Sequence, residues 1–408
     1  MKIVLFISRI IVALVFVFSG IVKCIDPSGT AIKIDDYFVV WGLEVPFAIS
    51  MMLSVAQSVV EFLVGALLLT RSWVKYVSWC ALLFMILYTP LTLYIAIANP
   101  VSDCGCFGDA VKLSNWQTFF KNLVLLPMAI LLVRGARSYN KSSNIVRDSV
   151  SALVFATMAI CVCISGTADE PQLDFRPYSV GVNIPKAMEI PEDAAQPEYS
   201  TTFILEKDGQ EKEFDEVNYP YNDTTWHFVT SKTEVISEGY VPPIKDFAIT
   251  DREDNVVTED ILHSAEPIVL AISPRLADVS EEHFQMLKEL QDAARAAERR
   301  FFIVTATVDQ MADFENKAQM GFDFLSADEI MLKTITRSNP GIIVLNEGTI
   351  VAKYHPDHIQ NADLFGNPAA AYLTYQRAAW ENVLIGFCIC IFVLIILIIN
   401  LLYKHKTK

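Results

Sequence analysis

The hydrophobic positions of the chain fall into long, nearly uninterrupted runs that are separated by short polar segments. A helix needs about 20 consecutive apolar residues to cross the hydrocarbon core of a bilayer. The SGIVKCIDP stretch after the first run is a poor small-residue cleavage site, so this run is interpreted as a span and not as a secretory signal. The pattern predicts an α-helical bundle of about six transmembrane spans, at about 3–22, 47–69, 74–98, 116–133, 149–167 and 383–403.

The segment between the fifth and sixth runs has a different periodicity. Within 168–243, alternating stretches such as TTFILE and TWHFVTS predict the short strands of a β-rich segment. Within 244–370, the apolar stretches PIVLAIS and FFIVTATV flank a helix at about 279–299, and the hairpin GIIVLNEGTIVAKYH follows. We therefore predict a multi-domain membrane protein, in which the helical bundle carries a β-rich segment and an α/β domain.

Charge divides the chain in the same way. Residues 168–382 carry 39 acidic and 17 basic side chains, a balance of −22, whereas the remainder carries 8 acidic and 15 basic ones, a balance of +7. The negative charge of residues 168–382 does not attract nucleic acid. The apolar remainder predicts the lipid bilayer as its partner.

Lysine and arginine positions predict the orientation. They gather at both chain ends and after the second and fourth spans, which is one side of the membrane if the spans alternate. That side is expected to be the cytoplasm. Residues 136–167 then form a cytoplasmic loop and the fifth span, and residues 168–382 are periplasmic, in a bacterial inner membrane.

The loop DCGCFGD at 103–109 places Cys104 and Cys106 on the outer side, where disulfides form and persist. Its flanking residues favour turns, so the thiols have no core to fill. A disulfide across Gly105 would be strained and readily reduced. Alternatively, one loop cysteine bonds to a cysteine near the outer ends of the spans and leaves its neighbour to attack; the candidate partners are Cys24, Cys161 and Cys163.

Two other readings of the cysteines stay open. Cysteine is a common small apolar filler of buried helices, which suits the intramembrane cysteines. A metal site is disfavoured because the membrane part has no second Cys or His pair at ligand spacing, and HPDH at 355–358 contains a proline and indicates a turn.

Glu61 lies within the apolar second span, and Gln57 lies one helical turn before it. An intramembrane carboxylate is costly and is a functional candidate. It could handle the protons that thiol oxidation releases, or it could form a hydrogen bond between helices. Lys23 is interpreted as an anchor that reaches the membrane surface.

FSGIVKCIDP at 18–27, SVVEFLVGALLL at 58–69 and the DCGCFGD loop together resemble the DoxX-like, MauE-type (methylamine utilisation) redox-associated membrane proteins. The resemblance covers about residues 1–135 and implies a four-helix bundle. It also implies redox handling of periplasmic thiols by Cys104 and Cys106, with a membrane quinone as the candidate electron carrier. Methylamine chemistry itself does not follow from it.

The strand, helix, strand and hairpin pattern of 244–370 resembles a thioredoxin-like domain, with Pro340 at the position of its cis-proline. In that fold the nucleophilic cysteines follow the first core strand, where this chain reads SPRLADVS without cysteine. The resemblance therefore implies a non-catalytic domain, with a client-binding groove beside Ser273 and Pro340.

Two functions follow as hypotheses. The first is a membrane thiol–disulfide oxidoreductase with Cys104, Cys106 and Glu61 in the site, acting on thiol-bearing periplasmic clients. The second is a non-catalytic membrane scaffold in which the loop disulfide is structural.

Overall fold

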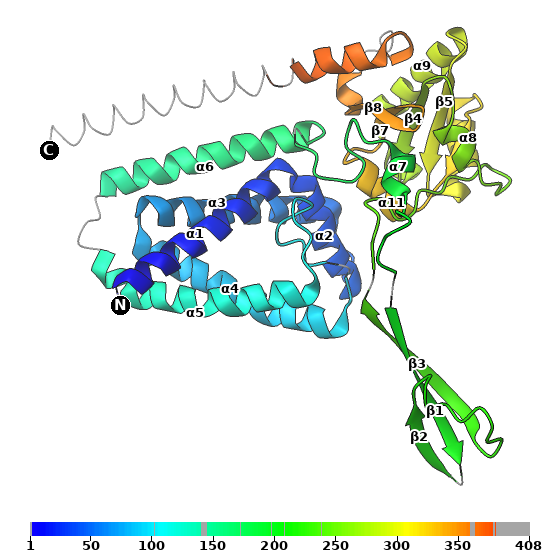
Figure 1. Ribbon diagram of the computed structural model, residues 1–408. Coiled ribbons are helices and arrows are strands. Elements are labelled where there is room, and N and C mark those ends of the chain that lie inside the picture. The colour runs from blue at the N-terminus through cyan, green and yellow to red at the C-terminus, as the bar shows by residue number, and fades with distance from the viewer. Residues whose placement is uncertain are drawn as a thin grey trace, which may run out of the picture.

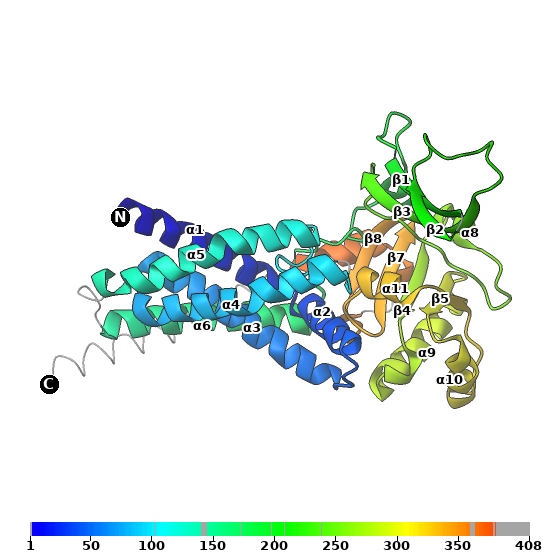
Figure 2. The same ribbon diagram turned by 90° about the horizontal axis from the view of Figure 1, so that it is seen from below.

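Five long apolar helices form the N-terminal part of the computed structural model, which describes residues 2–101, 103–139, 145–171, 173–196, 198–207, 209–237, 239–359, 364–377 and 380. Each helix is long and apolar enough to cross a membrane, and the helices run alongside one another (Figures 1 and 2). They are α1 (Lys2–Ile25), α3 (Phe47–Thr70), α4 (Val74–Ala98), α5 (Asn115–Tyr139) and α6 (Ile145–Ala168). The five N-terminal runs are thus confirmed as helices, whereas the run predicted at 383–403 lies outside the described residues.

Glycines bring α1 and α3 into close contact. A Cβ atom on Gly20 would lie 2.3 Å from the backbone nitrogen of Phe62, and one on Gly65 would lie 2.5 Å from that of Val17. Only residues without a side chain permit this approach, which is typical of helix pairs in membranes. The close crossing allows short side chains of the two helices to meet inside the bundle.

The segment at 23–46 contains a helix that the apolar pattern does not predict. Helix α2 (Pro27–Val40) begins at Asp26, whose side chain accepts a hydrogen bond from the backbone nitrogen of Gly29. Pro27 occupies the first helical position, where its missing N–H costs nothing. This cap places the Asp26 carboxylate at the C-terminal end of α1.

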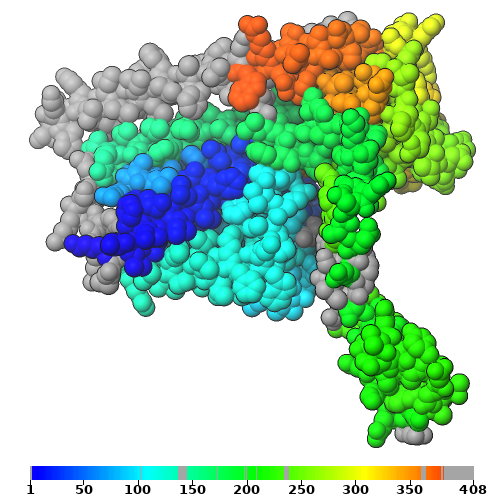
Figure 3. Space-filling view, viewed as in Figure 1, coloured from blue at the N-terminus to red at the C-terminus, as the bar shows by residue number. Residues whose placement is uncertain are grey.

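The region after α6 contains two separate sheets. Strands β1 (Glu198–Lys207), β2 (Gln210–Phe214) and β3 (His227–Ser237) form an antiparallel sheet in the order β2-β1-β3. It stands clear of the rest of the molecule (Figures 1 and 3). This sheet confirms the strands expected within 168–243.

The second sheet has five strands in the order β6-β5-β4-β7-β8. Strands β4, β5 and β6 are parallel, β7 is antiparallel to β4, and β8 is antiparallel to β7. The strands are β4 (Ile268–Ser273), β5 (Arg300–Thr305), β6 (Phe324–Ser326), β7 (Gly341–Asn346) and β8 (Thr349–Tyr354). Alternate residues of β4 face opposite hydrophobic clusters, which explains why PIVLAIS is apolar throughout.

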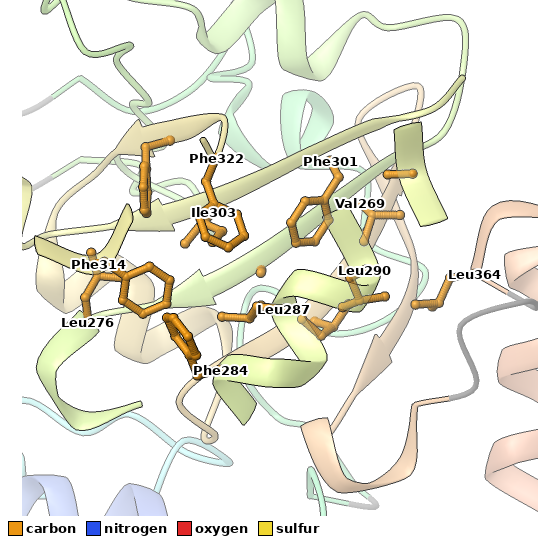
Figure 4. Packing of buried hydrophobic residues seen from close by; sticks show 14 of the residues in the cluster. Val269, Leu276, Phe284, Leu287, Leu290, Phe301, Ile303, Phe314, Phe322 and Leu364 are labelled. Carbon is orange, nitrogen blue, oxygen red and sulfur yellow. The ribbon is translucent and has the colours of Figure 1, made fainter. Parts of the chain in front are cut away.

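Helices cover both faces of this sheet. On one face lie α9 (Glu281–Ala296) and α10 (Met311–Ala318), where Phe284 and Phe314 pack with their ring centroids 4.8 Å apart (Figure 4). On the other lie α7 (Ile184–Met188), α8 (Thr258–Leu262) and α11 (Glu329–Ile335). Because Ile184 is buried in the second cluster, the segment before the β1–β3 sheet also packs against this domain.

Candidate functional site

The cysteine loop between α4 and α5 turns on two glycines with positive φ, Gly105 at 66° and Gly108 at 52°. The backbone nitrogen of Gly105 donates a hydrogen bond to the Asp103 carboxylate at 2.9 Å, and that of Gly108 donates to the carbonyl of Gly105 at 3.1 Å. A side chain would strain both positions. The turn brings the sulfur atoms of Cys104 and Cys106 to 3.0 Å from each other.

The two thiols have opposite acidities. A hydrogen bond from Cys104, together with the nearby charges of Lys121 and Lys23, lowers the pKa of Cys106 to about 6, although burial opposes this shift. The same hydrogen bond and burial raise the pKa of Cys104 well above its ordinary value. These shifts favour Cys106 as the thiolate of the pair and Cys104 as the thiol that donates a hydrogen bond to it.

The carboxylates that flank the cysteines are both paired. The ammonium group of Lys33 lies 3.1 Å from the Asp103 carboxylate. Asp109 accepts a hydrogen bond at 2.8 Å from Arg337. Arg337 belongs to the domain of the five-stranded sheet, which we call the outer domain after the membrane side that its sequence predicts. The negative charges of Asp103 and Asp109 are therefore largely compensated at the loop, which favours a thiolate.

A buried polar network lies directly beneath the loop. The Glu61 carboxylate in α3 is 2% exposed, and both of its oxygens accept hydrogen bonds from Lys23 in α1, at 2.8 and 2.9 Å. It also accepts hydrogen bonds from Ser19, Gln57 and Tyr88. The contact expected between Gln57 and Glu61 is present, but the interpretation of Lys23 as a surface anchor is wrong, because the close α1–α3 crossing encloses it.

Ser19 connects this network to the cysteine loop. Its hydroxyl oxygen lies 2.6 Å from Oε2 of Glu61 and 2.6 Å from the backbone carbonyl oxygen of Cys106. A hydroxyl group has a single proton and can donate to only one of these acceptors at a time. One more proton, on Glu61, would satisfy both contacts.

A cavity of about 30 Å³ separates Glu61 and Tyr88 from Cys106, with Lys121 and Phe107 also in its wall. A water molecule requires roughly 10–15 Å³, whereas a benzene-sized ring occupies a cavity of about 150 Å³. The cavity therefore fits water between Cys106 and Glu61. This cavity is too small for the quinone that the sequence resemblance implies.

The other described cysteines are Cys24, Cys80, Cys161 and Cys163. Cys24 in α1 and Cys163 in α6 share one apolar cluster, and their side chains lie close enough to interact. Cys161 is half-buried and Cys80 is exposed. The structure thus brings Cys24 to Cys163 and Cys104 to Cys106. Among the described residues, no group of three or more His, Cys, Asp or Glu side chains is arranged for a metal ion.

The proposed client groove is also a support for the loop before β7. Ser273 is completely buried and donates a hydrogen bond to the side chain of Asn339 at 2.7 Å. Pro340 is buried as well, and the Asn339–Pro340 peptide bond is cis. The Ser273 hydroxyl therefore holds this loop in place, and the client-binding groove expected beside Ser273 and Pro340 stays a prediction.

The loop before Pro340 joins the outer domain to the bundle through Arg337. The Arg337 guanidinium, 8% exposed, lies 2.8 Å from the Asp26 carboxylate and 2.8 Å from that of Asp109. A Cβ atom on Gly29 would lie 2.7 Å from the guanidinium, so the arginine is pressed against the start of α2. We call the group of Arg337, Asp26 and Asp109 the arginine clamp.

Glu170, just after α6, holds the same loop from its other side. It accepts hydrogen bonds from the Thr336 hydroxyl at 2.7 Å and from the backbone nitrogen of Arg337 at 3.0 Å. Burial alone would raise the pKa of Glu170, but the charges of Arg176 and Lys353 lower it to about 2. The carboxylate is therefore ionised and fixes the loop over the bundle.

The sequence patterns missed the roles of Ser19, Lys23, Tyr88 and Arg337. An intramembrane carboxylate requires a partner, so the sequence could have indicated that Glu61 pairs with Lys23 at the end of the first apolar run. For Arg337 the signal was absent, since its carboxylates lie 228 and 311 positions away in the chain.

Comparison with known proteins gives two partial matches. Residues 1–135, about a third of the chain, match the model of the methylamine utilisation protein MauE family. Residues 199–238, which include most of the β1–β3 sheet, match a domain of unknown function, DUF8463. No curated protein and no solved structure matches the chain significantly. The first match agrees with apolar membrane helices and suggests an accessory role in redox chemistry or cofactor maturation.

Proposed function

We propose that the chain is a membrane thiol–disulfide redox protein, whose Cys104 and Cys106 exchange a disulfide with thiols of clients on the outer side of a bacterial inner membrane. The observation that carries this proposal is the facing thiol pair with opposite acidities, placed above a buried polar network. The match of residues 1–135 to a family named for methylamine utilisation supports the membrane setting.

The acidities set the order of the exchange. In the oxidised loop, a client thiolate attacks the sulfur of Cys104, because Cys106 is the more acidic thiol and leaves more readily. A mixed disulfide forms between the client and Cys104, and Cys106 departs as a thiolate beside Lys121 and Lys23. The second client thiolate then attacks the client sulfur and releases Cys104. The client has lost two electrons, which the loop has gained.

The buried network accounts for the protons. A client dithiol that becomes a disulfide loses two protons, of which Cys104 takes one while Cys106 stays ionised. We assign the other proton to Glu61, because the Ser19 hydroxyl and a cavity with room for water connect this carboxylate to the cysteine loop. Lys23 compensates the charge of Glu61 while the carboxylate is ionised.

The outer domain completes the proposed architecture. Its strand order and the helix α9 between β4 and β5 support a thioredoxin-like fold. Residues 168–382 contain no cysteine, so the domain supplies no thiol of its own. We infer that it positions the cysteine loop through the arginine clamp, with both chain ends in the cytoplasm.

The test is the midpoint potential of the loop in the full-length protein. The protein is equilibrated in glutathione and dithiothreitol redox buffers, and the free thiols of Cys104 and Cys106 are mapped by alkylation and mass spectrometry. A potential above about −230 mV is expected of an exchangeable disulfide. A bond that resists reduction below about −300 mV would instead mark a structural staple.

The second candidate is a non-catalytic scaffold, favoured by the absence of cysteine from the outer domain. For a scaffold, replacing Cys104 and Cys106 by serine lowers the stability of the protein and abolishes no activity. For the redox protein, the same replacement abolishes oxidation of a dithiol peptide.

A further inference from the structure

A second pair of thiols lies between α1 and α6. Cys24 in α1 and Cys163 in α6 are each 1% exposed, and their side chains lie close enough to interact. They share an apolar cluster with Phe62, Ala66 and Ala159. A thiol has no strong hydrogen-bonding partner in such surroundings other than the second thiol.

Helix α6 is pressed against the end of α1 at this point. Gly166 lies one turn after Cys163, and a Cβ atom there would lie 2.4 Å from the carbonyl oxygen of Ile25 and 2.9 Å from Pro27. The absence of a side chain at Gly166 therefore lets the two backbones approach beside the thiols. A disulfide requires Cα atoms about 4.4–6.8 Å apart, and a close approach of the two backbones beside the thiols favours such a spacing.

The same two chain segments lead to the contacts of the outer domain. Asp26, two residues after Cys24, binds Arg337 in the arginine clamp. Glu170, seven residues after Cys163, accepts the backbone hydrogen bond of Arg337. A disulfide between Cys24 and Cys163 would thus connect the two segments, after α1 and after α6, that hold the outer domain through Asp26 and Glu170.

We propose that Cys24 and Cys163 are a second thiol–disulfide site. Their disulfide links α1 to α6, the helix that leads into the outer domain. A protein disulfide on the outer side of the membrane is the oxidant. One cysteine thiolate attacks the donor disulfide and forms a mixed disulfide, and the other cysteine then displaces the donor. The two cysteines lose two electrons and two protons, and the donor leaves as two thiols. This site is independent of redox cycling at Cys104 and Cys106.

The test is peptide-resolved alkylation of the full-length protein in isolated membranes. The membranes are dissolved in sodium dodecyl sulfate with N-ethylmaleimide and without reductant, so that every free thiol reacts regardless of burial. Cys80, which is exposed in the structure, is the internal standard for a free thiol. We expect Cys24 and Cys163 to be labelled about tenfold less than Cys80, since a disulfide has no thiolate to alkylate, and to be labelled fully after reduction.

Two serine variants distinguish this pairing from others. Cys163→Ser should leave Cys24 free and labelled as strongly as Cys80. Cys161→Ser, a matched change two residues away, should leave Cys24 protected. The measurement is repeated with Cys104 and Cys106 both replaced by serine, where protection of Cys24 should persist even if the loop proves to be a staple. Full labelling of Cys24 and Cys163 in the unaltered protein, or protection of Cys24 in Cys163→Ser, would overturn the proposal.

Discussion

Lys23 and Glu61 form a buried ion pair, and removing either partner alone should destabilise the protein. Their side chains are 3% and 2% exposed, so solvent does not weaken the interaction. Removing one partner of a buried pair costs about 3–5 kcal/mol, since the other charge is left uncompensated. Glu61→Gln and Lys23→Met should each lower the free energy of unfolding by roughly that amount.

The double variant tests whether the two single losses arise from the same ion pair. With both charges gone, neither is left unpaired, so its loss should be smaller than the sum of the single losses by about 2–3 kcal/mol. Equilibrium unfolding in mixed detergent micelles, followed by tryptophan fluorescence, measures all four proteins. Lys112→Met removes a lysine that is 57% exposed and should cost less than about 1 kcal/mol. Additive losses in the double variant would refute the buried pair.

Three further predictions concern the cysteine loop, the arginine clamp and Glu170. The rate at which Cys106 reacts with iodoacetamide should follow an apparent pKa of about 6, and Lys121→Met should raise that pKa, because one stabilising cation is lost; a titration near pH 9 in the unaltered protein would contradict the thiolate assignment. Arg337→Ala should weaken the contact between the outer domain and the bundle by roughly 2–3 kcal/mol, the value for a buried pair reduced for partial exposure. It should also speed limited proteolysis after α6, whereas an unchanged cleavage rate would show that the arginine clamp does not stabilise this contact. The pKa of Glu170 is lowered from 4.5 to about 2, so its stabilising contribution is complete above pH 4.5 and is lost as the pH falls toward 2; Glu170→Gln should reduce this acid sensitivity in a proteolysis series, and an unchanged pH profile would exclude Glu170 as its source.

Local patterns predicted the parts of the fold that local physics determines. The bilayer fixes the length of an apolar helix, so the runs at 47–69 and 74–98 correspond to α3 and α4 within a few residues. A turn of glycine and aspartate is equally local, which is why DCGCFGD could be read as a site that brings two thiols together. Helix α2 escaped prediction because its apolar face is weak and its start depends on the Asp26 cap.

Contacts between distant segments could not be read from the sequence. Arg337 follows α11 in an acidic domain and has no neighbour in the chain that indicates its partners. Only the folded outer domain brings it to Asp26 and Asp109. Likewise, Cys163 meets Cys24 because Gly166 lets α6 approach α1, a relation between residues that lie 139 positions apart.

The arrangement as a whole gives the cysteine-free outer domain a reason to be attached to this bundle. A redox loop flanked by two aspartates would hold its thiols protonated, because nearby negative charge raises a thiol pKa. Lys33 compensates Asp103 from within the membrane part, but Asp109 obtains its close partner, at 2.8 Å, from Arg337 of the outer domain. An outer domain that leaves its seat therefore takes a positive charge away from the loop. The acidity of Cys106 should consequently fall when Arg337 is replaced by alanine, and it should be restored only in part by lysine, which cannot hold two carboxylates in the same fork. Iodoacetamide titration of Arg337→Ala and Arg337→Lys measures this shift, and an unchanged Cys106 profile in both would restrict the outer domain to a mechanical role.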